Sequence, residues 1–334
     1  MRLHFRHILA AGLTWLAASA VAAGERPELV VYTYDSFVSD WGPGPAIEKA
    51  FEARCGCDLK LVGVGDGAAL LGRIRLEGAR SPADVVLGLD TNLTHAAAAT
   101  GLFAEHGRAG LDLDLPIAWE DRIFLPYDWG FFAFVHDKGR VPEPPHSFEA
   151  LAASDLKIVI EDPRSSTPGL GLLLWVKTAY GERAAEIWKG LADNIVTVTK
   201  GWSEAYGMFL DGEADMVLSY TTSPAYHRVA EKDDSKDWAR FDEGHYMQVE
   251  VMGRLKASDQ PELAQKFIDF MLSDEAQAII PTTNWMYPAR MPEGGLPEGF
   301  RVKPLPEPAL LLSPEQAAAV RDAALAEWLT ALGR

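Results

Sequence analysis

Residues 124–136 read FLPYDWGFFAFVH, a long, extended and aromatic run. Residues 246–255, YMQVEVMGRL, alternate like a strand that enters another sheet. We interpret both as crossings, at which the chain leaves one lobe and later returns to it. A chain of 334 residues is long enough for two lobes. The predicted division assigns residues 24–126 and 246–334 to lobe 1 and residues 127–245 to lobe 2.

Strand-like and helical patterns alternate on both sides of the first crossing. Three near-continuous apolar runs predict strands, and the residues between them have helical periodicity. The strands are expected at 29–34, 59–64 and 84–89, and the helices at 43–54, 67–77 and 93–99. The same alternation continues after the first crossing. Strands are expected at 158–160, 195–198 and 216–220, a helix at 182–194 and a last helix from Ser313. Alternation of this kind predicts an α/β fold with parallel sheets.

The composition excludes several classes of protein. The chain is 48% hydrophobic and 24% charged, which is typical of a globular protein and excludes wholesale disorder. Its net charge of −17 would repel phosphate backbones and anionic lipids, so we expect neither nucleic acid nor a membrane surface as a partner. The same charge is compatible with a cationic ligand, although acidic solubility alone also explains it.

The first 23 residues have the form of a secretory signal peptide. Arg2 and Arg6 precede an apolar run from Ile8 to Ala23, and Ala20-Val21-Ala22 has the small-residue pattern of a cleavage site. We therefore expect export to the periplasm and removal of residues 1–23. Removal deletes two arginines and no acid, so the mature charge would be −19.

The two cysteines stand in Cys55-Gly56-Cys57. Export to an oxidising compartment favours a disulfide between them. A pair of reduced, half-buried thiols is the alternative. A metal site would need further ligands, and none lie close in the sequence, so no metal is expected.

Familiar catalytic motifs are missing. The sequence contains no G-x-x-x-x-G-K-[ST], no H-E-x-x-H and no G-x-S-x-G. The eight histidines do not cluster in the sequence. The sequence therefore offers no support for nucleotide, zinc-protease or serine-hydrolase chemistry.

Three predicted helices begin with short polar side chains directly after a strand or turn. These starts are Asp66-Gly67, Ser166-Thr167-Pro168-Gly169 and Ser223-Pro224. Ordinary capping explains them. A helix N-terminus also carries free N–H groups that suit an anion, and βα turns lie where α/β folds bind ligands. Both interpretations stay open at this point.

Aromatic residues gather near the same turns. They are Tyr34 and Trp41 after the first strand, Trp202 in Lys200-Gly201-Trp202-Ser203, Tyr220 and Tyr226 on either side of the third helix start, and Trp285 with Tyr287. A flat aromatic or cationic ligand would use such residues through stacking and cation–π contact. Packing of one lobe on the other is the competing explanation.

Six segments together resemble one family, the periplasmic thiamine-binding proteins, which are substrate-binding subunits of bacterial ABC transporters. The resemblance covers nearly the whole mature chain and is weakest at 292–308 and in the last helix. The segments are VYTYDSFVSDWGPGP (31–45), ADVVLGLD (83–90), DPRSSTPGLGLLLW (162–175), VTVTKGWSEAYGMFL (196–210), VLSYTTSPAYH (217–227) and TTNWMYPA (282–289).

The resemblance implies a two-lobed type II periplasmic-binding-protein fold with two crossing strands at the hinge. It also implies thiamine, thiamine monophosphate and thiamine diphosphate as ligands, the membrane permease of an ABC importer as partner, a monomer and no cofactor. The family's cleft positions match Asp66, Gly67, Ser166, Thr167, Trp202, Tyr220, Thr221, Thr222, Ser223 and Pro224. Tyr34, Tyr226 and Trp285 match its aromatic wall, and Asp66 is the acid placed to balance the ligand's positive charge.

Three alternatives share this fold. Thiamine-degrading enzymes use a cysteine nucleophile, and the only cysteines here, Cys55 and Cys57, are expected to be paired. Iron carriers favour adjacent tyrosines, whereas Tyr220 and Tyr226 are six positions apart. Polyamine carriers want several carboxylates around the aromatic residues, and the sequence places only Asp66 there. We therefore expect a carrier without catalytic activity.

Overall fold

A computed structural model describes residues 26–301 and 303–333. The expected signal peptide, residues 1–23, lies outside the described residues. Within the described part of the chain, no helix has both the length and the apolar character needed to cross a bilayer.

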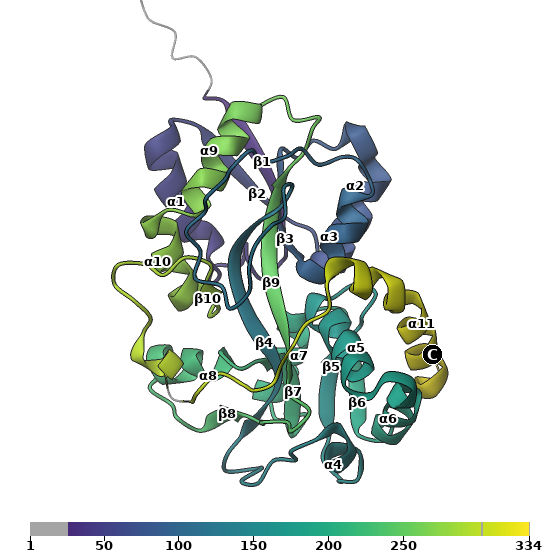
Figure 1. Cartoon of the computed structure of the whole chain (residues 1–334). Coiled ribbons are helices and arrows are strands. Elements are labelled where there is room, and N and C mark those ends of the chain that lie inside the picture. The colour runs from purple at the N-terminus through teal and green to yellow at the C-terminus, as the bar shows by residue number, and fades with distance from the viewer. Residues whose placement is uncertain (1–25, 302, 334) are drawn as a thin grey trace, which may run out of the picture.

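Lobe 1 is built on parallel strands flanked by helices (Figure 1). The β-branched run Val30-Val31 lies inside the first strand, which pairs in parallel with the next two strands of the lobe. The strands are β1 (Glu28–Thr33), β2 (Asp58–Gly63) and β3 (Val85–Asp90). The helices are α1 (Gly44–Cys55), α2 (Gly67–Glu77), α3 (Thr91–Ala98), α9 (Pro261–Met271) and α10 (Asp274–Thr283), with a 3-10 turn η1 (Gly78–Arg80).

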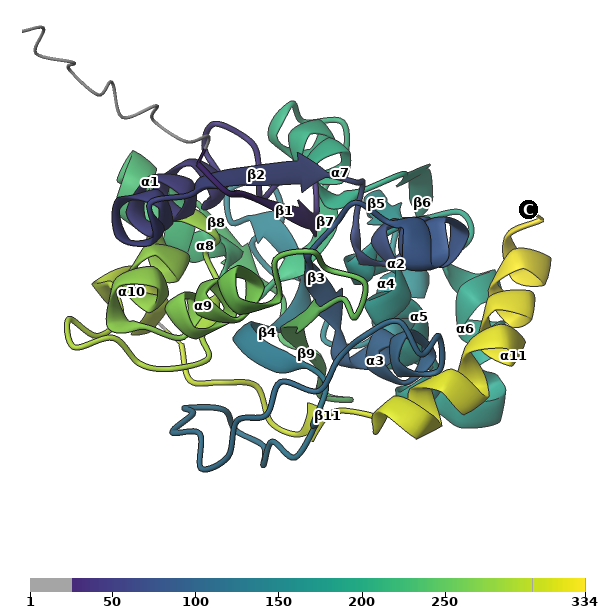
Figure 2. The same ribbon diagram turned by 90° about the horizontal axis from the view of Figure 1, so that it is seen from above.

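Helices cover both faces of the lobe 1 sheet. Figure 2 shows α1, α9 and α10 on one side and α2 and α3 on the other. On the first side, Phe51 of α1 packs edge-on against Phe267 of α9, with ring centroids 5.2 Å apart. The inner strands β1 and β3 are therefore buried on both faces, which explains their nearly continuous apolar sequences, whereas the edge strand β2 is partly exposed.

Two long antiparallel strands join the lobes. They are β4 (Leu125–Asp137) and β9 (His245–Arg254), which run through the middle of the molecule in Figure 1. Both are buried along almost their whole length. The predicted crossings at 124–136 and 246–255 thus form the hinge of the molecule.

Lobe 2 repeats the α/β theme. Strand β5 pairs in parallel with β6 and β7, and β7 pairs antiparallel with the second half of β4. The strands are β5 (Ile158–Glu161), β6 (Ile195–Thr199), β7 (Met216–Tyr220) and β8 (Lys236–Trp238). The helices are α4 (Phe148–Ala152), α5 (Thr167–Tyr180), α6 (Ala184–Leu191), α7 (Trp202–Leu210) and α8 (Ser223–Tyr226), with a 3-10 turn η2 (Gly181–Arg183) and a π-helical turn η3 (His227–Glu231).

The helix expected at 182–194 is shorter in the structure. A 3-10 turn precedes it, and α6 ends at Leu191. Asn194, three residues later, turns its side-chain amide to the backbone carbonyl groups of Leu151, Ser154 and Leu156 at 2.8–3.2 Å. These bonds fix a turn into β6, so the chain stops following the helix.

The C-terminal segment lies on both lobes. Strands β10 (Tyr287–Pro288) and β11 (Ala309–Leu310) pair with β4 and β9, a 3-10 turn η4 (Glu298–Arg301) lies between them, and α11 (Pro314–Leu332) follows. A Ser313–Gln316 capping box begins α11. This helix, which our division assigns to lobe 1, packs on α3 of lobe 1 and on α5 and α6 of lobe 2.

The cysteines form a disulfide. Cys55 at the end of α1 is bonded to Cys57, and Gly56 between them has φ 63°. The left-handed conformation suits a glycine, which also ends the helix.

Candidate functional site

A cavity of about 330 Å³ lies between the two lobes. Loops after the strands of both lobes contribute to it, together with α7, the hinge strand β9 and the end of α10. Its lining residues are Tyr34, Ser36, Trp41, Asp66, Thr167, Pro168, Trp202, Ser203, Tyr206, Gly207, Leu210, Tyr220, Ser223, Tyr226, Glu250, Thr283, Asn284, Trp285 and Met286.

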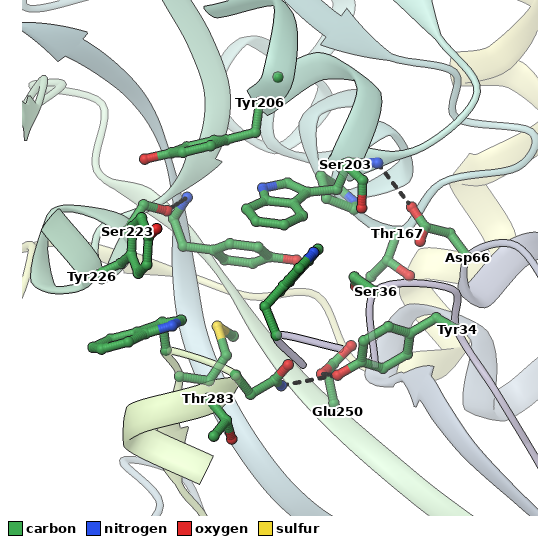
Figure 3. A pocket seen from close by; sticks show the side chains of 18 of the residues that line it. Tyr34, Ser36, Asp66, Thr167, Ser203, Tyr206, Ser223, Tyr226, Glu250 and Thr283 are labelled. Carbon is green, nitrogen blue, oxygen red and sulfur yellow. Dashed lines mark hydrogen bonds between the residues drawn. The ribbon is translucent and has the colours of Figure 1, made fainter. Parts of the chain in front are cut away.

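Most of the residues matched to the family's cleft meet at this cavity (Figure 3). They come from positions 34 to 285, so folding brings together side chains from nearly the whole length of the chain. Those on the lining are Tyr34, Asp66, Thr167, Trp202, Tyr220, Ser223, Tyr226 and Trp285. Gly67, Ser166, Thr221, Thr222 and Pro224 are not on it.

Gly67 and Ser166 lie behind the lining because they hold helix starts. The Gly67 N–H, at the first turn of α2, donates to Thr167 Oγ1 at 3.2 Å across the cleft. The fully buried Ser166 hydroxyl accepts from the Gly169 N–H and caps α5. Both residues therefore position Thr167, the residue of this start that reaches the cavity.

Thr221, Thr222 and Pro224 turn away from the cavity. The Thr221 N–H donates to the Phe131 carbonyl at 2.9 Å, and Thr222 Oγ1 lies 3.8 Å from Met286 Sδ. The turn between β7 and α8 points only some of its side chains inward. A run of small polar residues in the sequence does not reveal which ones.

Two aromatic groups form opposite parts of the lining. Trp202 and Tyr206, one turn apart on α7, stack with ring centroids 5.1 Å apart, and the Trp202 indole N–H donates to Ser219 Oγ at 2.8 Å. Trp41 of lobe 1 reaches to 6.1 Å from Trp202. We call Trp202 and Tyr206 the α7 stack. Sequence analysis missed Tyr206, although its spacing of four from Trp202 on a helix could have indicated it.

The second aromatic group joins the lobes. Tyr226 of α8 lies edge-on to Trp285, with ring centroids 5.3 Å apart. Trp285 has φ 56°, an unusual and strained conformation for a residue with a side chain. Its ring lies nearly parallel to Phe300 at 6.5 Å, which holds it in place.

Hydrogen bonds to residues outside the cavity lining hold the α7 stack in position. The Tyr206 hydroxyl lies 2.9 Å from His227 Nε2, and His227 Nδ1 lies 2.6 Å from Glu231 Oε2. Burial raises the pKa of Tyr206, so its hydroxyl keeps its proton and donates to His227. His227, Glu231 and Asp233 have the donor atoms for a metal ion, but they lie outside the cavity lining, and the imidazole nitrogens are already hydrogen-bonded.

The cavity has acidic groups and no basic ones. Among the described residues that line it, Asp66 and Glu250 are acids, and none is lysine, arginine or histidine. Burial raises the pKa of Asp66 to about 6. The Ser166 hydroxyl and the backbone N–H of Trp202, whose nitrogen lies 3.4 Å from Asp66 Oδ2, oppose this rise by stabilising the carboxylate. Since Asp66 belongs to lobe 1 and Trp202 to lobe 2, this acid also ties the lobes together.

Glu250 corrects the expectation that Asp66 is the one acid at the cleft. It stands on the hinge strand β9, and its Oε2 accepts from the Tyr34 hydroxyl at 3.1 Å and the Tyr127 hydroxyl at 2.9 Å. The sequence contained a signal for it, because a charged residue inside an otherwise apolar strand is costly to bury unless it has a structural or functional role. The arrangement as a whole suits a flat, positively charged ring.

Comparisons with known proteins agree with this geometry. The family described as bacterial extracellular solute-binding protein matches residues 43–278. The chain is 54% identical to the thiamine-binding periplasmic protein of Salmonella typhimurium over 324 residues, covering 96% of this chain and 98% of that protein. It is 55% identical to the thiamine-binding periplasmic protein of Escherichia coli over 311 residues, covering 92% and 94%.

A solved structure gives the same result in three dimensions. The structure of a periplasmic thiamin binding protein superposes with a TM-score of 0.90 at 54% identity, covering 92% of this chain and 97% of that one. The two-lobed periplasmic-binding-protein fold expected from the sequence is therefore confirmed.

Proposed function

This chain belongs to the bacterial extracellular solute-binding proteins and, among them, to the thiamine-binding periplasmic proteins, and from that premise we propose that it captures thiamine in the cavity between its lobes. It is a periplasmic solute-binding protein of an ABC import system. The observation that carries the assignment is an aromatic cavity with two acids and, among its described lining residues, no base.

The chemistry of thiamine matches this lining. Thiamine joins a flat aminopyrimidine to a cationic thiazolium ring with a hydroxyethyl arm. Aromatic faces attract such rings by stacking and cation–π contact. Asp66 and Glu250 supply negative charge for the thiazolium. Closing the lobes excludes water and strengthens these electrostatic contacts.

The alternatives within the fold are less well supported. A ferric site needs ionised phenols, but burial among acids raises the pKa of Tyr34 and Tyr220 well above its ordinary value, and both hydroxyls donate to neighbours, Glu250 and Gln248. A polyamine site gains a second carboxylate from Glu250, so spermidine is the competitor to test.

Thiamine monophosphate and diphosphate are further proposed ligands. Thr167 lines the cavity at the first turn of α5, where a helix N-terminus has partial positive charge. Asp66 beside it opposes an anion. We expect the local hydrogen bonds to outweigh this repulsion, so that the monophosphate binds at least as well as thiamine.

We also propose binding without turnover. The cysteines, which a thiamine-degrading enzyme of this fold would use as nucleophile, are joined in a disulfide and do not line the cavity. Thiamine released from the protein should therefore be chemically unchanged. Time-dependent appearance of free pyrimidine or thiazole would contradict this.

Export, assembly state and delivery complete the proposal. Residues 1–23 are removed as a signal peptide, the mature protein is a monomer, and it delivers its ligand to the membrane permease. N-terminal sequencing of periplasmic protein should find a start near Ala23 or Gly24. An intact Met1 in that material would contradict the proposed cleavage.

Calorimetric titration with thiamine, spermidine and ferric citrate tests the function. We expect saturable binding of one thiamine per chain and no saturable heat with the other two ligands. Tighter binding of spermidine or ferric citrate than of thiamine would refute the proposal.

A further inference from the structure

Two acids face each other at the hinge, beside the cavity. Asp128 of β4 and Glu250 of β9 are paired residues of the two crossing strands. Asp128 is fully buried and Glu250 is 6% exposed, with its exposed part on the cavity lining. Asp90, at the end of β3, pairs with Glu250 on its other side. Three neighbouring strands thus bring three carboxyl groups into one row.

The hydrogen bonds around the pair leave one buried carboxyl oxygen without a donor. Glu250 Oε2 accepts from the hydroxyls of Tyr34 and Tyr127, and Asp128 Oδ2 accepts from the Asn284 amide at 2.6 Å. Asp128 Oδ1 is buried and accepts from no N–H or hydroxyl group. Glu250 is the cross-strand partner of Asp128, and two facing carboxyl groups can share a hydrogen bond only when one of them keeps a proton.

No fixed positive charge compensates the pair. Among the described residues, no lysine, arginine or histidine forms an ion pair with Asp128 or Glu250. Burial raises the pKa of both carboxyls above the ordinary values, and the charge of Glu250 raises that of Asp128 further. In the empty cleft the pair therefore favours holding one proton.

The surrounding phenols do not change this balance, whereas the acids Asp90 and Asp66 titrate in the same pH range, so variants have to assign the proton. Three phenols face the pair: Tyr34 directly after β1, Tyr127 of β4 and Tyr220 of β7. They stay neutral, because burial raises the pKa of each well above its ordinary value. Burial raises the pKa of Asp90 to about 7, and the positive charge of Arg321 on α11 opposes this rise. Asp66, on the cavity lining, adds further negative character. A cation in the cavity would therefore be the missing positive charge.

Resting on the proposed function, we propose that the Asp128–Glu250 pair selects a cationic ligand by holding one proton in the empty cleft and releasing it when thiamine binds. The positive thiazolium stabilises the second carboxylate in a cavity that excludes water, where charges interact strongly. The proton passes to the buffer, and no other bond forms or breaks. Figure 3 shows Glu250 and Tyr34 side by side on the lining.

Titration calorimetry in buffers of different ionisation enthalpy measures the released proton directly. We expect close to one proton per thiamine near pH 6 and progressively less toward pH 8.5. At pH values below the titration range of the pair, thiamine affinity should increase by up to about tenfold for each unit by which the pH is raised. The control ligand is 3-deazathiamine, which keeps the aminopyrimidine but has an uncharged ring. It should bind without proton release and with an affinity independent of pH.

Variants assign the proton to its site. Glu250→Gln and Asp128→Asn should each abolish proton release and reduce the preference for thiamine over 3-deazathiamine. Asp66→Asn should weaken thiamine binding and keep most of the proton release, and the exposed Glu186→Gln should behave as wild type. Circular dichroism checks the fold of each variant. The comparison of the two ligands on wild type needs no variant.

Each outcome decides the inference. Thiamine binding to wild type without proton release, equal release with 3-deazathiamine, or release that disappears only in Asp66→Asn would overturn it. These results would leave thiamine capture standing. Absence of thiamine binding at any pH would instead refute the proposed function.

Discussion

At the scale of single residues, Trp202 and Trp285, two of the three tryptophans among the described lining residues, have different neighbours and the same predicted role. Trp202 stacks on Tyr206 within lobe 2, while Trp285 meets Tyr226 across the lobes. Trp202→Ala and Trp285→Ala should each weaken thiamine binding by about 1–3 kcal/mol, because each removes a ring face for the ligand. Fluorescence or calorimetric titration measures the change.

Trp328 is the matched control for these substitutions. It is 1% exposed on α11 and lies edge-on to Trp188, far from the cavity lining. Trp328→Ala should cost about 3–5 kcal/mol of unfolding free energy and leave thiamine affinity unchanged. If all three variants lose only stability, the cavity is not the binding site.

At the scale of elements, the starts of α2 and α5 touch across the cleft and need a glycine there. A Cβ on Gly67 would lie 2.5 Å from Thr167 Oγ1 and 2.9 Å from the Gly88 carbonyl oxygen. Gly67→Ala should therefore keep the lobes apart and weaken thiamine binding by about 1–3 kcal/mol, the usual cost of overpacking. Calorimetry measures the affinity.

Gly72, on the same helix, provides the control. A Cβ there meets nothing within 4 Å, so Gly72→Ala should leave affinity unchanged and stabilise α2 by up to about 1 kcal/mol. Equal affinities for the two variants would show that contact between these helix starts is not needed for binding.

The start of α5 also carries the phosphate prediction. Thr167→Val removes the hydroxyl of this helix N-terminus that lines the cavity, and Ser166→Ala removes the cap behind it; a hydrogen bond to a charged phosphate contributes about 1.5–3 kcal/mol at best. The double variant should lose more affinity for thiamine monophosphate than for thiamine. Titrating both ligands into both proteins gives a double difference. A value of zero within error would mean that this turn is only a helix cap.

Most of these elements could be predicted from the sequence because their signals are local. The helix expected at 67–77 is present with those bounds, and the apolar runs formed the expected strands. The hinge could be predicted from the unusual length of the run at 124–136. Helix ends such as that of α6 depend on contacts with other segments, which a single sequence does not show.

The site could be predicted only in part, for a related reason. Residues at loop tips, such as Trp202 and Trp285, were visible as aromatic side chains in polar surroundings. Glu250 and Asn284 were missed, because their importance appears only when β9 and α10 meet Tyr34 from β1. In the turn after β7, the backbone decides that Ser223 faces the cavity and Thr222 does not.

At the scale of the whole molecule, we expect buried acids to outweigh buried His245, whose pKa burial lowers to about 4, in setting how stability depends on pH. Burial raises the pKa of Asp66 to about 6, that of Asp90 to about 7 and that of Glu161 well above its ordinary value. A carboxyl with a raised pKa binds its proton more tightly in the folded state than in the unfolded state. It therefore adds stability below its unfolded pKa, near 4, and this stability is lost as pH rises through the folded value.

The ligand-free protein should thus melt at a higher temperature near pH 5.5 than at pH 8. We expect a difference of at least about 2 °C, corresponding to roughly 1 kcal/mol. Differential scanning calorimetry from pH 5 to 8.5 measures it, and Asp90→Asn should reduce the slope by removing one of the buried acids. A melting temperature that rises steadily toward pH 8 would contradict this account.

Helix α11 is a second connection between the two lobes, besides the hinge strands. It packs on both of them, and Lys177 of α5 forms an ion pair with Glu327 of α11 at 2.7 Å. The lobes are therefore joined at the hinge strands and along this helix. Opening of the cleft therefore involves these contacts on one side. On the other side it involves the hydrogen bonds of Asp66 and Thr167 between the lobes.

A crystal structure of the mature protein with thiamine tests the central claim most directly. The account predicts one unmodified thiamine in the cavity between the lobes, with its rings against the α7 stack and the Tyr226–Trp285 pair. It also predicts the Glu250 carboxylate on the side of the positive charge. Thiamine bound outside this cavity, or a cavity that stays without thiamine at saturating concentration, would contradict it.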